Sequence, residues 1–178
     1  MELYFITWNK NKFEEVNKIL PTIKHLDINL EEIQELDPKK IIQAKVIEAF
    51  KYKKWEFIIE DTSLYFDCLN WLPWPFIKWF IDKLWDVWIY NIVNKLWNTQ
   101  AEAKTMIWYA KSINEIYYFE WGIRGNIVKP NIKSNFWRDS IFQPNWYDKT
   151  FAELTKKEKN TISMRSIVIN KLKIFLWK

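Results

Sequence analysis

Glycine is nearly missing from this chain, although glycine is the residue on which most folds rely for tight turns and helix ends. Average usage of roughly 7% corresponds to about 12 glycines in a chain of this length. The 178 residues contain only Gly122 and Gly125, whereas tryptophan occurs 13 times. Any compact fold of this size needs backbone positions with positive φ, so other residues have to occupy them.

The tryptophans stand where glycine is expected. Asn70-Trp71, Pro73-Trp74-Pro75 and Asn145-Trp146 have the composition of turns. Trp85 and Trp97 each follow an apolar helical stretch, where glycine normally ends a helix. We hypothesise that most of these tryptophans are glycines in the natural protein, as results when a UGA codon reassigned to glycine is translated as tryptophan. Arginine is rare among the 27 basic residues, and Ile and Asn are abundant, which indicates an AT-rich gene.

The alternative takes the indoles literally, as an aromatic surface for sugars, single-stranded nucleic acid or a membrane interface. Such surfaces place aromatic residues at regular strand or helix spacing, whereas here they recur in turns. The gene decides between the two interpretations, because UGG codons at these positions would end the glycine hypothesis.

The rest of the composition describes one soluble domain. The 27 Lys and Arg against 22 Asp and Glu leave a net charge of +5, and the length is sufficient to bury a core. No apolar run approaches the roughly 18 residues that cross a membrane, and the opening residues lack the pattern of a signal peptide. A single cysteine, Cys68, fits a reducing compartment. We therefore expect a cytoplasmic protein in which residues 1–178 form one domain.

Apolar spacing predicts strands alternating with helices in the first half and a hairpin afterwards. Thr155 and Glu158 have the spacing of a capping box. This order predicts an α/β fold with a mixed central sheet flanked by helices. The expected strands are Leu3–Ile6, Phe57–Ile59, Lys104–Ala110, Ile116–Phe119 and Asn126–Val128, and the expected helices are Lys10–Leu20, Ile41–Phe50, Pro75–Leu84, Val87–Leu96 and Ile162–Phe175.

The first strand-to-helix junction is a candidate anion site. Thr7-Trp8-Asn9-Lys10-Asn11-Lys12 joins a buried strand to a helix whose first turn carries two lysines. Free backbone N–H groups and the helix dipole both favour phosphate there. A small residue at position 8 would let the amides approach a triphosphate, whereas an indole would obstruct them.

Acidic residues offer a metal site. Asp61 follows Ile58-Ile59 out of the core, and a carboxylate at the end of a buried strand suits Mg²⁺, which takes oxygen ligands and bridges to phosphates. Glu31 and Glu35 fit ordinary surface charge better. His25, the only histidine, lies in a polar connection and is expected to be exposed, so Ser-His or Cys-His catalysis is not indicated.

The last third concentrates polar and aromatic groups at Ser134–Asp139, Lys159-Asn160 and Ser163–Arg165. An aromatic ring beside an aspartate can stack on a base and accept a hydrogen bond from its edge, and Lys159 and Arg165 could complete a cationic pocket. From the residues alone, this stays a suggestion.

In this order, the motifs resemble the ITP/XTP pyrophosphatase family, which acts on non-standard purine nucleoside triphosphates, and the likeness covers nearly the whole chain. Positions 8, 74, 137 and 146 carry Trp where that family has glycine, whereas Trp79 falls where its members can carry Trp. The matching segments are Thr7–Lys12, Glu60–Thr62, Leu72–Phe76, Ile77–Phe80, Phe136–Asp139, Trp146–Leu154 and Glu158–Arg165.

The resemblance implies two lobes around a substrate cleft and a site that releases pyrophosphate by attack of water at the α-phosphorus. Glu32 and Asp61 would bind Mg²⁺, and Asp61 would be the catalytic base. By family habit the protein would be a homodimer with a small nucleotide as substrate and no membrane or stable nucleic-acid partner. The substrate-binding residues implied are Thr7, Trp8, Asn9, Lys10, Asn11, Lys12, Lys45, Thr62, Lys78, Phe136, Trp137, Arg138, Asp139, Lys159, Met164 and Arg165.

Two departures from the family pattern lie at the base end. Met164 stands where the family has histidine, and Arg138 replaces an aromatic residue. Pyrophosphohydrolase activity is therefore a firmer expectation than ITP and XTP preference. A pyrophosphatase of the same fold for other modified nucleotides stays open, as does a non-catalytic Trp-rich protein drawn to nucleic acid by its basic charge.

Overall fold

The computed structural model describes residues 2–31, 33–52, 56–74, 76–132 and 137–177. Within these residues the chain forms a mixed sheet in the order β2-β1-β3-β4-β5-β6, so the α/β prediction is confirmed. None of the described helices is long and apolar enough to cross a bilayer. The strands are β1 (Leu3–Ile6), β2 (Lys24–Leu26), β3 (Glu56–Phe66), β4 (Gln100–Ser112), β5 (Glu115–Ile127) and β6 (Phe142–Pro144), and the α-helices are α1 (Lys10–Ile19), α2 (Pro38–Tyr52), α3 (Ile77–Lys95), α4 (Lys156–Ile162) and α5 (Met164–Leu176).

The chain divides into two compact units, which we describe separately. The first comprises Met1–Asp61, Thr105–Trp121 and Met164–Lys178, and the second comprises Thr62–Lys104 and Gly122–Ser163. The single domain predicted for residues 1–178 stays a prediction.

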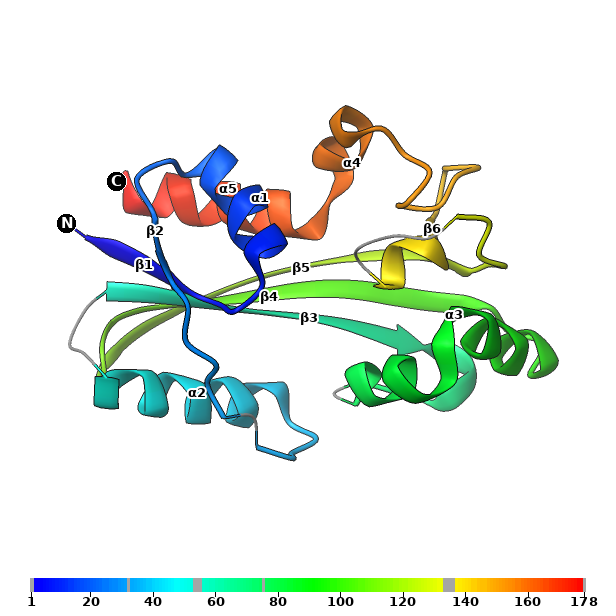
Figure 1. The fold of residues 1–178 in the computed structure, drawn as a ribbon, viewed down its shortest axis with the longest axis horizontal. Coiled ribbons are helices and arrows are strands. Elements are labelled where there is room, and N and C mark those ends of the chain that lie inside the picture. Colours follow the sequence, from blue (N-terminus) through cyan, green and yellow to red (C-terminus); the bar gives the residue numbers. More distant parts are fainter. Residues whose placement is uncertain (1, 32, 53–55, 75, 133–136, 178) are drawn as a thin grey trace. The chain divides into compact units, whose positions relative to one another are not determined.

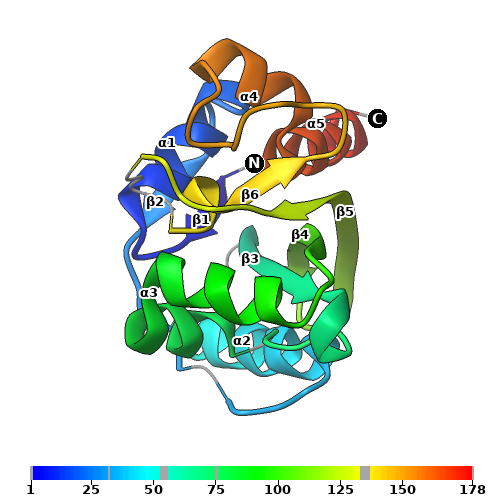
Figure 2. The same ribbon diagram turned by 90° about the vertical axis from the view of Figure 1, so that its right-hand side faces the viewer.

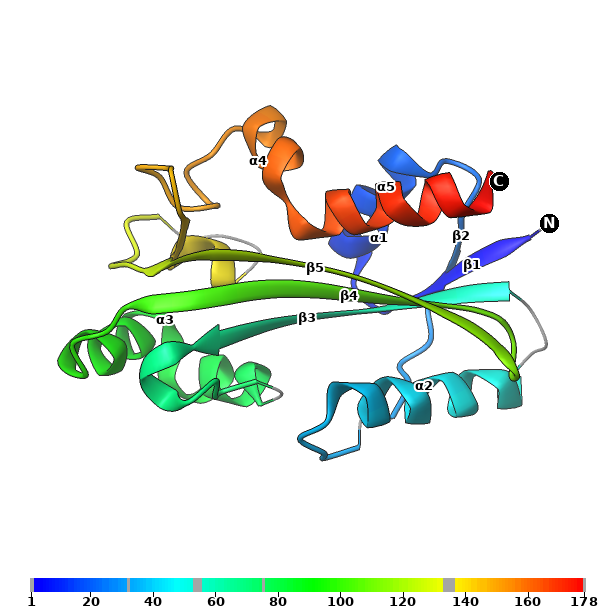
Figure 3. The same cartoon turned by 180° about the vertical axis from the view of Figure 1, so that it is seen from behind.

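The core of the first unit lies on both faces of β1 and β3. Phe5 and Ile58 pack with Val168 of α5 on the face that also carries α1. The other face is covered by α2, where the Phe50 ring lies 4.8 Å from that of Phe57 (Figures 1 and 3). Since successive side chains of a strand point to opposite faces, β3 supplies apolar residues to both layers. This explains why Phe57, Ile58 and Ile59 are consecutive apolar residues.

The second unit contains α3, whose two halves meet at Trp85, and β6 with the part of β5 that pairs with it, from Gly122 onward (Figure 2). The helical pair predicted from the sequence is therefore confirmed, with Trp85 as the break. Gly125 faces Pro144 across the β5–β6 ladder. A Cβ at Gly125 would lie 2.3 Å from the carbonyl oxygen of Gln143, so only glycine permits this close approach of the strands.

Several boundaries differ from the sequence prediction. β3 was predicted to end before Glu60, but it continues to Phe66, because the charge of Glu60 is compensated inside the fold. The two predicted pieces at 116–119 and 126–128 form one strand, β5. The predicted final helix, Ile162–Phe175, corresponds to α5 but begins at Met164, because Ser163, whose ψ of 126° is not helical, separates it from α4. The short strands β2 and β6 were not predicted.

The capping box at the start of α4 is confirmed. Thr155 Oγ1 accepts the Glu158 N–H at 3.2 Å, and Glu158 Oε2 accepts the Thr155 N–H at 2.8 Å. We expect Thr155→Ala to lower the free energy of unfolding by about 1 kcal/mol, because the Glu158 N–H at the helix start loses its side-chain acceptor. Urea titration measures the change.

The same substitution at Thr161, on the same helix but away from its start, is the control. Its hydroxyl donates to the Glu158 carbonyl oxygen, which is already a helix acceptor, and alanine favours the helix more than threonine. Equal stability losses in the two variants would contradict the role given to the capping box.

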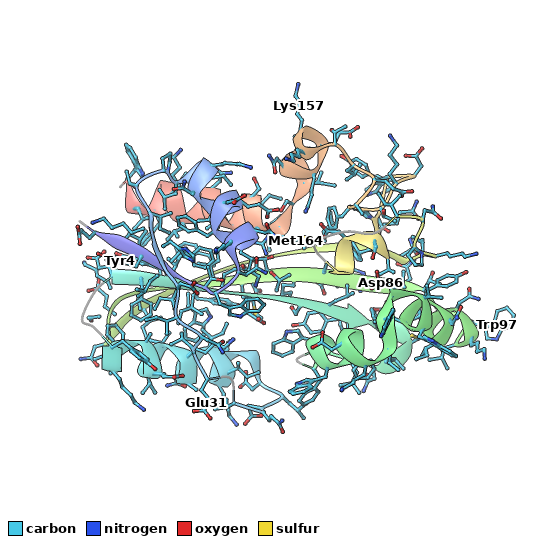
Figure 4. The ribbon with its side chains drawn as sticks, viewed as in Figure 1. Tyr4, Glu31, Asp86, Trp97, Lys157 and Met164 are labelled. Carbon is cyan, nitrogen blue, oxygen red and sulfur yellow. The ribbon has the colours of Figure 1, made fainter. Side chains whose placement is uncertain are left out.

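Four tryptophans adopt the backbone conformation of glycine. Positive φ occurs at Trp71 (72°), Trp85 (59°), Trp97 (58°) and Trp146 (73°). Figure 4 shows Trp97 projecting from the end of α3, where its side chain is 95% exposed. Positive φ is rare for a bulky L-residue, so the geometry supports the glycine hypothesis at these positions. Trp74 differs, because its side chain is buried.

Candidate active site

The loop that follows β1 is braced by its own polar groups. The Thr7 N–H donates to the Leu26 carbonyl oxygen at 3.2 Å, and Thr7 Oγ1 accepts the Asn9 N–H at 3.2 Å. Asn9 caps α1 by accepting the Lys12 N–H at 3.1 Å. The predicted strand–loop–helix junction is therefore confirmed, and it places the positive end of a helix dipole beside Thr7 and Asn9.

His25 contributes to this loop, contrary to the sequence prediction of an exposed residue. Its Nε2 lies 2.8 Å from the Thr7 carbonyl oxygen, and its ring stacks on Phe13 with centroids 4.4 Å apart. Because a carbonyl oxygen only accepts, Nε2 carries the proton and donates it. The prediction failed because β2, which carries His25 next to β1, is only three residues long and has no clear strand pattern.

Trp8 occupies the centre of the predicted phosphate loop. Its side chain is 59% exposed. Lys10 and Asn11 follow as exposed residues in the first turn of α1, and Lys12 is half-buried. The amides and lysines predicted to bind phosphate thus belong to one loop and one helix turn, and the indole shares that loop.

Asp61 lies within β3, level with the loop that follows the end of β1. β1 and β3 are parallel, and Ile6 pairs with Ile59. Continuing this register brings the residues after Ile6 to the level of Glu60 and Asp61. Polar groups beyond the carboxyl ends of neighbouring parallel strands are the usual setting of ligand sites in α/β proteins. The half-buried Asp61 is therefore adjacent to the predicted phosphate loop.

Asp61 and Glu60 point to opposite faces of β3. Ile58 belongs to the α1 and α5 side, so Glu60 shares that face, whereas Asp61 shares the α2 face with Phe57. Lys45, predicted to bind the triphosphate, is a half-buried residue of α2. The alternation thus places Asp61 and Lys45 on the same side of the sheet.

Glu60 joins a charged cluster that the sequence did not reveal. Its carboxylate pairs with Lys12 and Arg165, and Glu15 pairs with the other side of Arg165. Burial disfavours the charged form of Arg165, but Glu60 and Glu15 outweigh that effect, so its pKa is raised above the ordinary value. Met164, which precedes Arg165, is also buried. The predicted substrate-binding roles of Met164 and Arg165 stay predictions.

In the second unit, the structure brings two of the predicted base-pocket residues together. Lys159 Nζ donates to Asp139 Oδ2 at 2.6 Å, and the exposed fractions of their side chains are 16% and 3%. Trp137 and Arg138 precede Asp139 in a short 3-10 helix, Trp137–Ser140. Thr62 is buried in β3, and Lys78 lies in the first turn of α3. Phe136 lies outside the described residues.

The described residues contain no group of three or more His, Cys, Asp or Glu side chains arranged to hold a metal ion. Glu32, one of the two predicted magnesium ligands, lies outside the described residues. Asp61 alone still fits the chemistry of Mg²⁺, which proteins often hold through one or two carboxylates together with substrate phosphates.

Comparison with known proteins gives consistent results along the whole chain. A sequence profile of the Ham1 family matches residues 3–175. The inosine triphosphate pyrophosphatase of Schizosaccharomyces pombe is 34% identical over 98% of this chain and 94% of its own length. That of Kluyveromyces lactis is 36% identical over 99% of this chain and 96% of its own length.

Solved structures show the same fold. A HAM1 protein from Coxiella burnetii superposes with a TM-score of 0.84 at 22% identity, covering 99% of this chain and 98% of its own. The Staphylococcus aureus Ham1 protein has a TM-score of 0.77 at 25% identity, and the alignment covers 98% of both chains.

Proposed function

The chain belongs to the Ham1 family, and from this premise we propose that it hydrolyses the non-standard purine nucleoside triphosphates ITP, dITP and XTP to the monophosphate and pyrophosphate. The observation that supports the proposal is the register of β1 and β3, which brings Asp61 level with the loop Thr7–Asn9. By the same family resemblance the protein is proposed to be a cytoplasmic homodimer.

The loop and the start of α1 are proposed to hold the triphosphate. The Asn9 cap fixes the first turn of α1, whose amides and dipole favour phosphate oxygens. Lys12, and Lys45 from α2, would add the positive charge that compensates the phosphates. This division between backbone donors and lysines is common in sites that bind triphosphates.

Asp61 and Glu32 are proposed to hold Mg²⁺. When bound, such an ion compensates charge on the phosphate oxygens during phosphoryl transfer. Asp61 is at the same time the proposed base, accepting a proton from the attacking water. The new bond forms between the water oxygen and the α-phosphorus, and the bond from that phosphorus to the bridging oxygen of the pyrophosphate breaks.

The purine is proposed to contact the residues around Asp139. The Asp139 carboxylate, held by Lys159 at 2.6 Å, would accept a hydrogen bond from the N1–H of the base, which a 6-oxo purine has and adenine lacks. Phe136, Trp137 and Arg138 complete this region in the proposal. Met164 and Arg138 leave other modified nucleotides as candidate substrates.

A pyrophosphate-release assay over a panel of nucleotides tests the proposal. We expect release from ITP, dITP and XTP at a kcat/KM at least about 100-fold above that for ATP. EDTA should abolish turnover and added Mg²⁺ restore it. Equal turnover of ATP would contradict the substrate class, and undiminished turnover in EDTA would contradict the metal requirement. A protein that binds single-stranded nucleic acid with steep salt dependence and hydrolyses nothing would instead fit the non-catalytic alternative.

A further inference from the structure

The carboxylate of Glu60 is a buried acidic group directly before the proposed base, Asp61. It shares a face of β3 with Ile58, which belongs to the core between the sheet, α1 and α5. The Glu60 side chain has no exposed surface. A carboxylate in such a place is costly unless cations compensate its charge.

Two cations from different helices meet on Glu60. Lys12 Nζ of α1 lies 3.3 Å from Oε2, and Arg165 of α5 donates from Nε to Oε2 at 3.2 Å and from Nη2 to Oε1 at 3.4 Å. Glu15 accepts a further hydrogen bond from Arg165 Nη1. These contacts join two carboxylates to two cations, whose formal charges balance.

Lys12 is the cation of this cluster that reaches toward solvent. Its side chain is 21% exposed, whereas that of Arg165 is 2% exposed. The Lys12 backbone is also fixed, because its N–H is bonded to the Asn9 side chain. An ammonium can donate three hydrogen bonds, and the exposed part of the Lys12 side chain is within reach of an anion from solution.

We propose that Glu60 is a positioning residue that holds the Lys12 ammonium at the phosphate loop and is itself held in place by Arg165. The inference rests on the proposed function, because it assumes that Lys12 faces the pyrophosphate part of the substrate. Glu60 touches no substrate atom in this role. Because Glu60 already orders the Lys12 ammonium before substrate binds, less side-chain entropy is lost on binding.

A double-mutant cycle tests the proposal with Glu60→Gln, Lys12→Met and the double variant. Glu60→Gln should raise KM for ITP about tenfold, because Lys12 loses a charged hydrogen-bond partner. It should raise Kd for inorganic pyrophosphate, measured by calorimetry, by the same factor. In the Lys12→Met background, Glu60→Gln should cause no further change in either constant, since the residue through which it acts is gone.

Reduced stability must be separated from lost positioning, because Glu60→Gln also weakens a partner of the buried Arg165. Ile58→Val, two residues earlier on the same face of β3, lowers the thermal midpoint but should leave KM and Kd unchanged. If Glu60→Gln does not fold, Glu60→Asp keeps the charge but withdraws the carboxylate, and it should raise both constants as well.

Unchanged pyrophosphate affinity in the Glu60 variants, or additive effects in the double variant, would overturn the inference. The proposed function and the role of Glu60 can be refuted independently of each other. A parent protein that binds pyrophosphate but releases none from ITP contradicts the proposed function, while the calorimetric cycle still decides the role of Glu60.

Discussion

Asp61→Asn is expected to lower kcat for pyrophosphate release from ITP by about 10³-fold, the loss typical of removing a general base. The amide that replaces the carboxylate has almost the same shape, so the backbone of β3 should be unaffected. The amide is neutral and is not a base, so it cannot accept the proton of the attacking water. It is also a poorer ligand for Mg²⁺. A coupled assay for pyrophosphate measures the change.

The expected loss concerns chemistry and not folding. Asp82→Asn, the same substitution at an exposed position of α3, should leave kcat unchanged. Circular dichroism and the thermal midpoint of the Asp61 variant should match those of the parent. If the Asp61 variant keeps full activity, the assignment of Asp61 as base and metal ligand is refuted.

Replacing Trp71, Trp85, Trp97 and Trp146 together by glycine is expected to raise the free energy of unfolding by about 4 kcal/mol. Positive φ destabilises an L-residue by about 1–2 kcal/mol, a cost that glycine avoids. Glycine also makes the unfolded chain more flexible, which offsets about 0.4–1 kcal/mol of this gain. The indoles contribute little burial, since they are between 49% and 99% exposed. The net gain is therefore about 1 kcal/mol for each site, measured by urea unfolding.

The local geometry supports this expectation site by site. Trp146 is the third residue of a turn closed by a hydrogen bond from the Tyr147 N–H to the Pro144 carbonyl oxygen at 3.2 Å, where positive φ favours glycine. Trp97 follows the end of α3, the usual place of a terminating glycine. Trp85 has φ 59° and ψ 162°, a region that essentially only glycine adopts.

Trp79→Gly is the matched control, because Trp79 is 57% exposed and lies within the helical part of α3. Glycine there should destabilise the protein by up to about 1 kcal/mol. The gene supplies a second check, with UGA expected at the four positions and UGG at Trp79. A loss of stability in the fourfold variant, or UGG at all of these sites, would end the glycine hypothesis.

Much of the fold could be predicted from local patterns. The β1–α1 junction, the capping box of Thr155 and the break at Trp85 each depend on residues close in sequence, so composition and spacing were sufficient. β2 and β6 were missed because three-residue strands carry too few side chains to show a period, and their neighbours in space decide that they are extended. The length of β3 was missed because a glutamate normally ends a buried strand, and here two distant cations compensate it.

The sequence by itself determined the family resemblance and the junction between β1 and α1, and it predicted the role of Asp61 and the positions that favour glycine, since each depends on residue identity and short spacing. Only the tertiary structure decided that Glu60 binds Lys12 and Arg165, that Asp139 is held by Lys159, and that His25 braces Thr7. Arg165 lies 105 residues from Glu60 along the chain. The charge balance that makes a buried carboxylate tolerable therefore exists only after α1, α5 and β3 have packed together.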